Sequence, residues 1–104
     1  RSTIWFARSR DGGRTFQPPF RISDDSGDAK DGDGTLEGAV PAVGPGGEVY
    51  VVWAGPKGLS FDRSDDGGWT FGKDVLIGTL TGGWDLPVPG VARHNGMPVT
   101  AVDL

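Results

Sequence analysis

One eight-residue stretch rich in Asp and Gly occurs twice, and its repetition limits the fold more than any other feature of this chain. The first copy runs from Ser9 to Phe16 and the second from Ser64 to Phe71, an offset of 55 residues. Segments 40–47 and 89–96 form a second similar pair, and each precedes a short apolar run. Repeats of this spacing are typical of proteins built from stacked supersecondary units.

The repeating unit is about fifty residues long and has the pattern of four short strands. Residues 49–53 form a continuous apolar run, as expected for a strand covered on both faces. The segments before each copy alternate partly between apolar and polar residues, whereas no segment has a helical period. A four-stranded unit of this size matches a propeller blade. We therefore expect an all-β chain of about two blades: a half blade at 3–23, a full blade at 38–79 and a half blade at 89–104.

The pattern Ser-x-Asp-Gly-Gly-x-Thr-Phe resembles the Asp box of sialidases and related β-propellers. The resemblance implies a parent ring of six blades with these hairpins on its outer rim, away from any substrate. The Asp can accept hydrogen bonds from backbone amides of its own turn, one Gly can take a positive φ, and the Phe can pack over the hairpin. The residues given this structural role are Ser9, Asp11, Gly13, Thr15, Phe16, Ser64, Asp66, Gly68, Thr70 and Phe71.

The same resemblance implies a catalytic set. Sialidases bind the substrate carboxylate with three arginines, and use a Tyr–Glu nucleophile pair and an Asp as acid/base. Arg21, in Phe-Arg-Ile-Ser, is similar to the first of those arginines, although Ser23 stands where the family has proline. The alternative for Arg21 is the solvent face of a strand. Tyr50 has Glu48 two positions away on the same face of its strand. The two residues could form the nucleophile pair, or Tyr50 is simply a tyrosine packed in the core.

An acidic loop follows the first half blade, in a connection that opens on the ligand-bearing face of a propeller. Asp31 is the candidate acid/base, because sialidases place theirs on such a loop. Alternating carboxylates also resemble a calcium loop, with Asp28, Asp31 and Asp33 as ligands, although the positions expected for the first and last ligands hold Ala29 and Val40. The simpler alternative is a solvent-exposed acidic loop without a bound metal or a catalytic residue, which also contains Asp24, Asp25 and Glu37.

The next connection between blades carries the substrate-binding candidates. Trp84 could stack on a sugar face or pack against the next blade, and Asp85 could accept hydrogen bonds from sugar hydroxyls. Arg93 is a candidate for binding a substrate carboxylate. His94 is best explained as an exposed turn residue.

Charge and composition disfavour several classes of partner. The net charge is −4, which disfavours nucleic acid, because phosphate binding needs a basic face. There is no cysteine, and no apolar run is long enough to span a bilayer. The expected partners are the remaining blades of a parent chain, further copies of this chain, and a glycan ligand. The family resemblance favours a secreted, periplasmic or cell-surface location.

Two classes of function follow. In the first, the parent is an exo-acting, sialidase-like glycoside hydrolase, and the isolated chain is inactive. In the second, the chain belongs to a non-catalytic propeller that binds glycans or proteins, or that only builds structure and self-assembles through its half blades. Apart from calcium, no cofactor is expected.

Overall fold

The computed structural model describes residues 1–30, 32–80, 88–91 and 95–103. Within these ranges the regular structure consists of strands alone, which confirms the all-β class. The strands are β1 (Trp5–Phe6), β2 (Phe20–Arg21), β3 (Glu37–Val43), β4 (Val49–Gly55), β5 (Gly58–Ser64) and β6 (Val75–Gly78). No helix that could cross a membrane is found among the residues so described.

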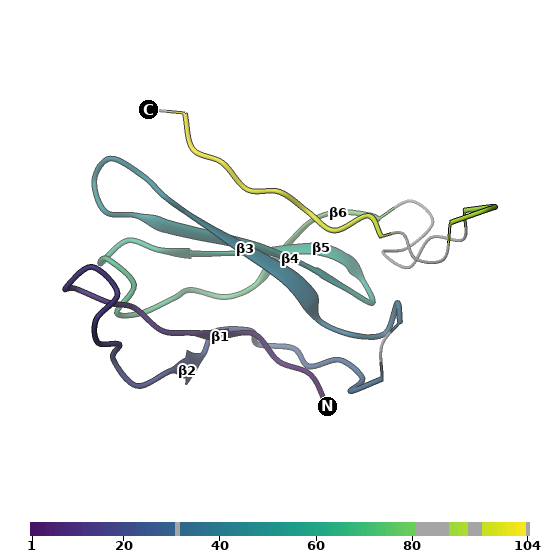
Figure 1. Cartoon of the computed structure of the whole chain (residues 1–104), viewed down its shortest axis with the longest axis horizontal. Coiled ribbons are helices and arrows are strands. Elements are labelled where there is room, and N and C mark those ends of the chain that lie inside the picture. Colours follow the sequence, from purple (N-terminus) through teal and green to yellow (C-terminus); the bar gives the residue numbers. More distant parts are fainter. Residues whose placement is uncertain (31, 81–87, 92–94, 104) are drawn as a thin grey trace.

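Strands β3 to β6 form one antiparallel sheet in chain order (Figure 1). The turn between β4 and β5 closes at Gly55 and Gly58, and the second Asp box connects β5 to β6. The continuous apolar run of β4 has the reason that its sequence predicts: Val51 and Trp53 are buried on one face, and Val52 and Ala54 on the other.

Strands β1 and β2 form a second, two-stranded sheet around the first Asp box. Phe6 lies directly opposite Phe20, and Ile22 donates a backbone hydrogen bond of 2.9 Å to the carbonyl of Ile4. This small sheet packs on one face of the four-stranded sheet (Figure 1). The core between them consists of Ile4, Ile22, Leu36, Val49, Val51 and Trp53, with Phe6, Phe20 and Phe71 half-buried at its border.

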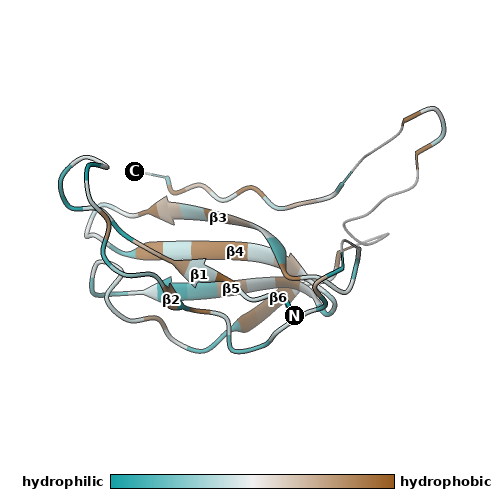
Figure 2. Ribbon diagram, turned by 60° about the horizontal axis from the view of Figure 1, so that its bottom comes forward, coloured by the Kyte–Doolittle hydropathy of each residue, from teal (hydrophilic) through white to brown (hydrophobic). Residues whose placement is uncertain are grey.

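The segment 95–103 runs beside β3, on the side of the large sheet away from β1 and β2 (Figures 1 and 2). Met97 lies against Gly38, since a Cβ on that glycine would be 2.8 Å from the methionine sulfur. The sequence predicts two strands between 89 and 104, but none of the described residues there belongs to a strand. A strand needs a partner for its backbone groups, and β3, the described strand beside this segment, pairs with β4 alone.

The antiparallel order gives the large sheet two different ends. The β3–β4 turn and the second Asp box lie at one end, and the first Asp box joins them there, because Arg8 donates a hydrogen bond to the carbonyl of Gly67. The β4–β5 turn and the acidic loop lie at the other end, where Lys57 contacts Asp25. The two ends therefore separate the repeated hairpins from the acidic loop.

Candidate functional site

The two Asp boxes have the same internal hydrogen bonds. Asp11 Oδ1 accepts from Ser9 Oγ at 2.8 Å and from the amides of Arg14 and Thr15 at 3.0 and 2.9 Å, while its Oδ2 accepts from Thr15 Oγ1. The amide of Gly13 donates to Ser9 Oγ at 2.8 Å. Because both carboxylate oxygens are occupied within the turn, this Asp has the geometry of a brace for the hairpin.

The second box repeats that network bond for bond. Asp66 Oδ1 accepts from Ser64 Oγ at 2.7 Å and from the amides of Trp69 and Thr70 at 3.0 and 2.9 Å, while Oδ2 accepts from Thr70 Oγ1. The amide of Gly68 donates to Ser64 Oγ at 2.8 Å. The sequence placed one positive-φ glycine in each box, whereas the structure has two: the φ angles are +74° and +89° in the first box and +76° and +91° in the second.

The hydrogen bonds also hold both carboxyl groups in their ionised form. The side-chain and backbone bonds from Thr15, followed by the bond from Ser9, lower the pKa of Asp11 to about 2. The equivalent bonds from Thr70 and Ser64 hold the pKa of Asp66 well below its ordinary value. A carboxylate that only accepts hydrogen bonds from its own turn has no proton to give in catalysis.

The surroundings of the two boxes differ. In the second box the ring of Phe71 lies 4.9 Å from the ring of Phe6 and 6.1 Å from that of Phe20, measured between centroids. The guanidinium carbon of Arg8 lies 3.9 Å from the ring centre of Trp69. This box is therefore packed against the preceding small sheet.

The first box has no such neighbour in the described part of the chain. Phe16, expected to pack over its hairpin, is 63% exposed, which corrects that expectation. A Cβ added to Gly12 or Gly13 would meet no heavy atom within 4 Å. The physical reason is that Phe71 packs on rings that lie before it in the chain, and no described residue offers Phe16 the same contact.

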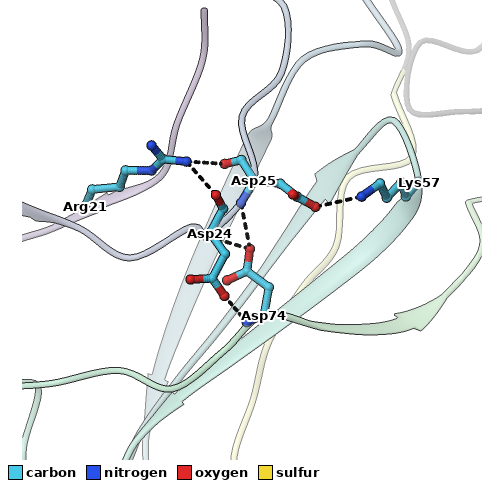
Figure 3. A network of polar contacts seen from close by, with 5 residues as sticks. All are labelled: Arg21, Asp24, Asp25, Lys57 and Asp74. Carbon is cyan, nitrogen blue, oxygen red and sulfur yellow. Dashed lines mark hydrogen bonds and ion pairs between the residues drawn. The ribbon is translucent and has the colours of Figure 1, made fainter.

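At the opposite end of the sheet, Arg21 bonds to the backbone of its own loop (Figure 3). Its Nε donates to the carbonyl of Ser23 at 2.6 Å, and its Nη2 donates to the carbonyls of Asp24 and Asp25 at 2.7 and 2.9 Å. These donors are the ones that a substrate carboxylate would use in a bidentate contact. The geometry therefore gives Arg21 a role in shaping the loop.

A reciprocal pair of bonds ties this loop to the segment after the second Asp box (Figure 3). The amide of Asp24 donates to Asp74 Oδ2 at 2.8 Å, and the amide of Asp74 donates to Asp24 Oδ2 at 2.6 Å. Burial, which is only partly offset by the amides of Asp24 and Asp25, raises the pKa of Asp74. We call this pair the Asp24–Asp74 clamp; it joins residues fifty positions apart in the sequence.

The loop and the β4–β5 turn enclose two adjoining hollows. The smaller has a volume of about 90 Å³ and lies between Asp25, Lys57 and the indole of Trp53. Lys57 Nζ is 2.9 Å from Asp25 Oδ2, and both side chains are more than half exposed. The larger, about 470 Å³, is open and is bordered by Arg1, Asp28 and Pro56. The Asp25 carboxylate and the Lys57 ammonium thus form an ion pair at the rim of the smaller hollow.

Several candidates from the sequence lie outside the described residues: Asp31, Trp84, Asp85 and Arg93, together with His94. Of the calcium candidates, Asp28 lies over Gly34, because a Cβ there would be 2.5 Å from Asp28 Oδ2, and Asp33 borders a hollow beside the β4–β5 turn. Among the described residues, no three His, Cys, Asp or Glu are grouped closely enough to hold a metal ion. Calcium binding at this loop stays a prediction, since Asp31, one of its three expected ligands, is not among the described residues.

Tyr50 has the surroundings of a packing residue. Its ring is half-buried and stacks on Phe61 with centroids 6.1 Å apart. Glu48 Oε2 accepts a hydrogen bond of 3.1 Å from the amide of Gly46 in the β3–β4 turn. Both residues lie toward the Asp-box end of the sheet, away from the hollows, so a nucleophile pair here would not face them.

Sequence reasoning missed a buried carboxylate in β5. Asp62 is 1% exposed; its Oδ1 accepts from the amide of Arg63 at 2.7 Å, and its Oδ2 is buried without a hydrogen-bond partner. Burial, with a smaller contribution from the carboxylates of Asp74 and Asp24, raises its pKa to about 6 against the lowering effect of the Arg63 amide. The alternation along β5 could have indicated this burial. Ser60, Asp62 and Ser64 lie opposite Trp53, Val51 and Val49 and so face the core.

Comparisons of the chain with models of known families, with curated proteins and with solved structures found no match.

Proposed function

We propose that this chain forms about two blades of a sialidase-like Asp-box β-propeller. The observation that carries the proposal is the pair of Asp boxes 55 residues apart with the same hydrogen bonds, the second of which packs on the hairpin formed by the first. Face-to-face packing of equivalent antiparallel units is how a propeller ring is built. The Asp boxes brace the units, and the ligand face is the opposite end, with the acidic loop.

For the parent ring, the first candidate is an exo-acting glycoside hydrolase of the sialidase type. Its support is the motif resemblance together with a carboxylate-rich loop beside the two hollows. In that case Asp31 supplies the acid/base, and Trp84, Asp85 and Arg93 contact the sugar. The isolated chain would be inactive, because the described residues hold no complete catalytic set.

A non-catalytic ring that binds glycans is the second candidate, and one observation favours it. The donors of Arg21 that would recognise a substrate carboxylate are bonded to three carbonyls of the chain itself. A ring with this arrangement can still bind sugar hydroxyls at its acidic loop without cleaving a glycosidic bond.

The structure of the ring that contains this chain tests the architecture. We expect both Asp boxes on its outer rim, related by rotation about one common axis; boxes related in any other way would refute the proposal. Hydrolysis of a sialyl reporter by the same protein separates the two candidates. Turnover that is lost in Asp31→Asn supports the hydrolase, whereas glycan binding without turnover supports the second candidate.

A further inference from the structure

The surface that receives the second Asp box has a counterpart on the far side of the large sheet. Phe71 packs on Phe6 and Phe20, which lie directly opposite each other in β1 and β2. At an offset of 55 residues stand Phe61 and Val75, which also lie directly opposite each other, in β5 and β6. The large sheet therefore presents the same cross-strand pair again, one module further along the chain.

This second pair faces away from the small sheet. Phe61 pairs with Val52, and they alternate along their strands with the buried Asp62 and the core residue Val51, so they lie on the opposite face. Val75 is 51% exposed, and Phe61 is half-buried beneath Tyr50. We call Phe61 and Val75 the acceptor pair.

The matching side chains are exposed on the outer face of the small sheet. Phe16, which corresponds to Phe71, is 63% exposed, and Trp5, which alternates with the inward-facing Ile4 and Phe6, is 59% exposed. The space beyond Gly12 and Gly13 is open. We call this surface, defined by Trp5 and Phe16, the donor face.

Polar groups repeat as well. Arg8 donates to the carbonyl of Gly67 and covers Trp69 within the chain. Arg63 stands at the position of Arg8 on the acceptor side, with its side chain 50% exposed and its Nε bonded to Asp65, which leaves the two terminal nitrogens of the guanidinium to meet a carbonyl. It is thus placed to meet the carbonyl of Gly12 in an incoming first Asp box, as Arg8 meets that of Gly67.

We propose that a second copy of this chain docks head-to-tail, with the donor face of one copy on the acceptor pair of the other. Phe16 would then lie over Phe61 and Val75 as Phe71 lies over Phe6 and Phe20. The proposal deepens the proposed function, because it depends on the two modules being equivalent. A contact between two different surfaces repeats from copy to copy, so it builds either a closed ring or a filament.

The segment 95–103 fits the same arrangement. It lies beside β3, at the edge of the large sheet opposite to β6, on the side away from β1 and β2 (Figures 1 and 2). The incoming β1 would arrive next to this segment and would offer it a strand to pair with, since none of its described residues belongs to a strand. On docking, backbone N–H and C=O groups of 95–103 would therefore form hydrogen bonds with the incoming β1.

Two complementary variants test the contact by sedimentation velocity. Phe16→Asp places a charge on the donor face, and Val75→Asp places a charge in the acceptor pair. Both positions are exposed, so both variants should fold. We expect the wild-type chain to assemble with rising concentration, and each variant alone to associate at least about tenfold more weakly. An equimolar mixture should form a 1:1 dimer, because one intact contact remains between the two variants.

A control and the opposing outcomes complete the design. Leu76→Asp adds the same charge on the same strand but on the opposite face, and should assemble like the wild type. A folded wild-type monomer at every concentration, unaffected assembly of both variants, or a mixture that stays monomeric would each overturn the proposal. Ring contacts between Phe71 and Phe6, followed by NMR, separate the two levels: a monomer that keeps them refutes only the docking, whereas their loss counts against the propeller packing itself.

Discussion

The two Asp boxes of this chain share their internal hydrogen bonds and differ in what lies around them. Each carboxylate is occupied by its own turn, and each serine hydroxyl accepts the amide of the second glycine. Among the residues that the structure describes, only the second box packs against a neighbouring hairpin, through Phe71 and Arg8. The motif thus fixes the shape of a turn by itself, while the phenylalanine at its end contributes to packing where a neighbouring hairpin supplies a surface.

The largest effect that we expect distinguishes the two phenylalanines. Phe71→Ala removes a ring in contact with two others and should lower the free energy of unfolding by about 3 kcal/mol. Phe16→Ala removes an exposed ring and should change it by about 0.5 kcal/mol or less. Urea unfolding at a concentration where the chain is monomeric measures both. Equal losses would show that the boxes are equally packed in solution.

The glycines give the next comparison. A Cβ on Gly68 would lie 2.8 Å from a ring carbon of Phe6, and the residue has a φ of +91°. Gly68→Ala should therefore cost about 2–3 kcal/mol, from backbone strain together with the displaced ring. Gly13→Ala has the same backbone strain but no clash, and should cost about 1 kcal/mol. Thermal unfolding of the pair measures the contribution of packing separately from that of backbone strain.

A third prediction concerns Asp62, whose counterpart in the first module is Ala7. Burial raises the pKa of Asp62 to about 6, so the folded chain holds this proton more tightly than the unfolded chain. This contribution to stability is fully present below the ordinary pKa of about 3.9 and is lost as the pH rises through about 6.

We expect the free energy of unfolding to rise by about 1 kcal/mol between pH 7.5 and pH 5, and the rise to disappear in Asp62→Asn. Asp65→Asn, at a carboxylate that is 70% exposed, is the control and should keep the rise. A pH dependence that is unchanged in Asp62→Asn would assign it to other groups, Asp74 first, because its pKa is also raised.

For the threonines of the two boxes we expect equal and small losses of stability. Thr15→Val and Thr70→Val each remove one hydroxyl bond to the Asp of the same box, and each should cost about 0.5–1 kcal/mol. The pKa of Asp11 should rise from about 2 toward its ordinary value in Thr15→Val, because the Thr15 hydroxyl is the main cause of its lowering. NMR titration of the carboxyl carbon measures this. Unequal costs at the two threonines would mean that packing reaches inside the motif.

The sequence predicted what depends on nearby residues. The all-β class followed from short alternating segments, and the bonds within each Asp box followed from a motif only eight residues long. Exposure of Phe16, the carbonyl partners of Arg21 and the burial of Asp62 were missed, because each depends on a neighbour brought in by the fold. The Asp24–Asp74 clamp joins positions fifty residues apart, and no local pattern marks such a pair.

That clamp also bears on how loops between modules can differ in length. It fixes the acidic loop at its first two residues, before Asp28, whose carboxylate borders the larger hollow. Gly27 gives the loop a second anchor, because it exchanges two backbone hydrogen bonds with Ser2, and the amide of Asp28 bonds to the carbonyl of Gly34. Positions can then be gained or lost between Asp28 and Gly34 without disturbing the contact between the sheets, since the anchors lie upstream of the change. Insertions in this stretch are a route by which such a protein could acquire a new ligand while keeping its framework.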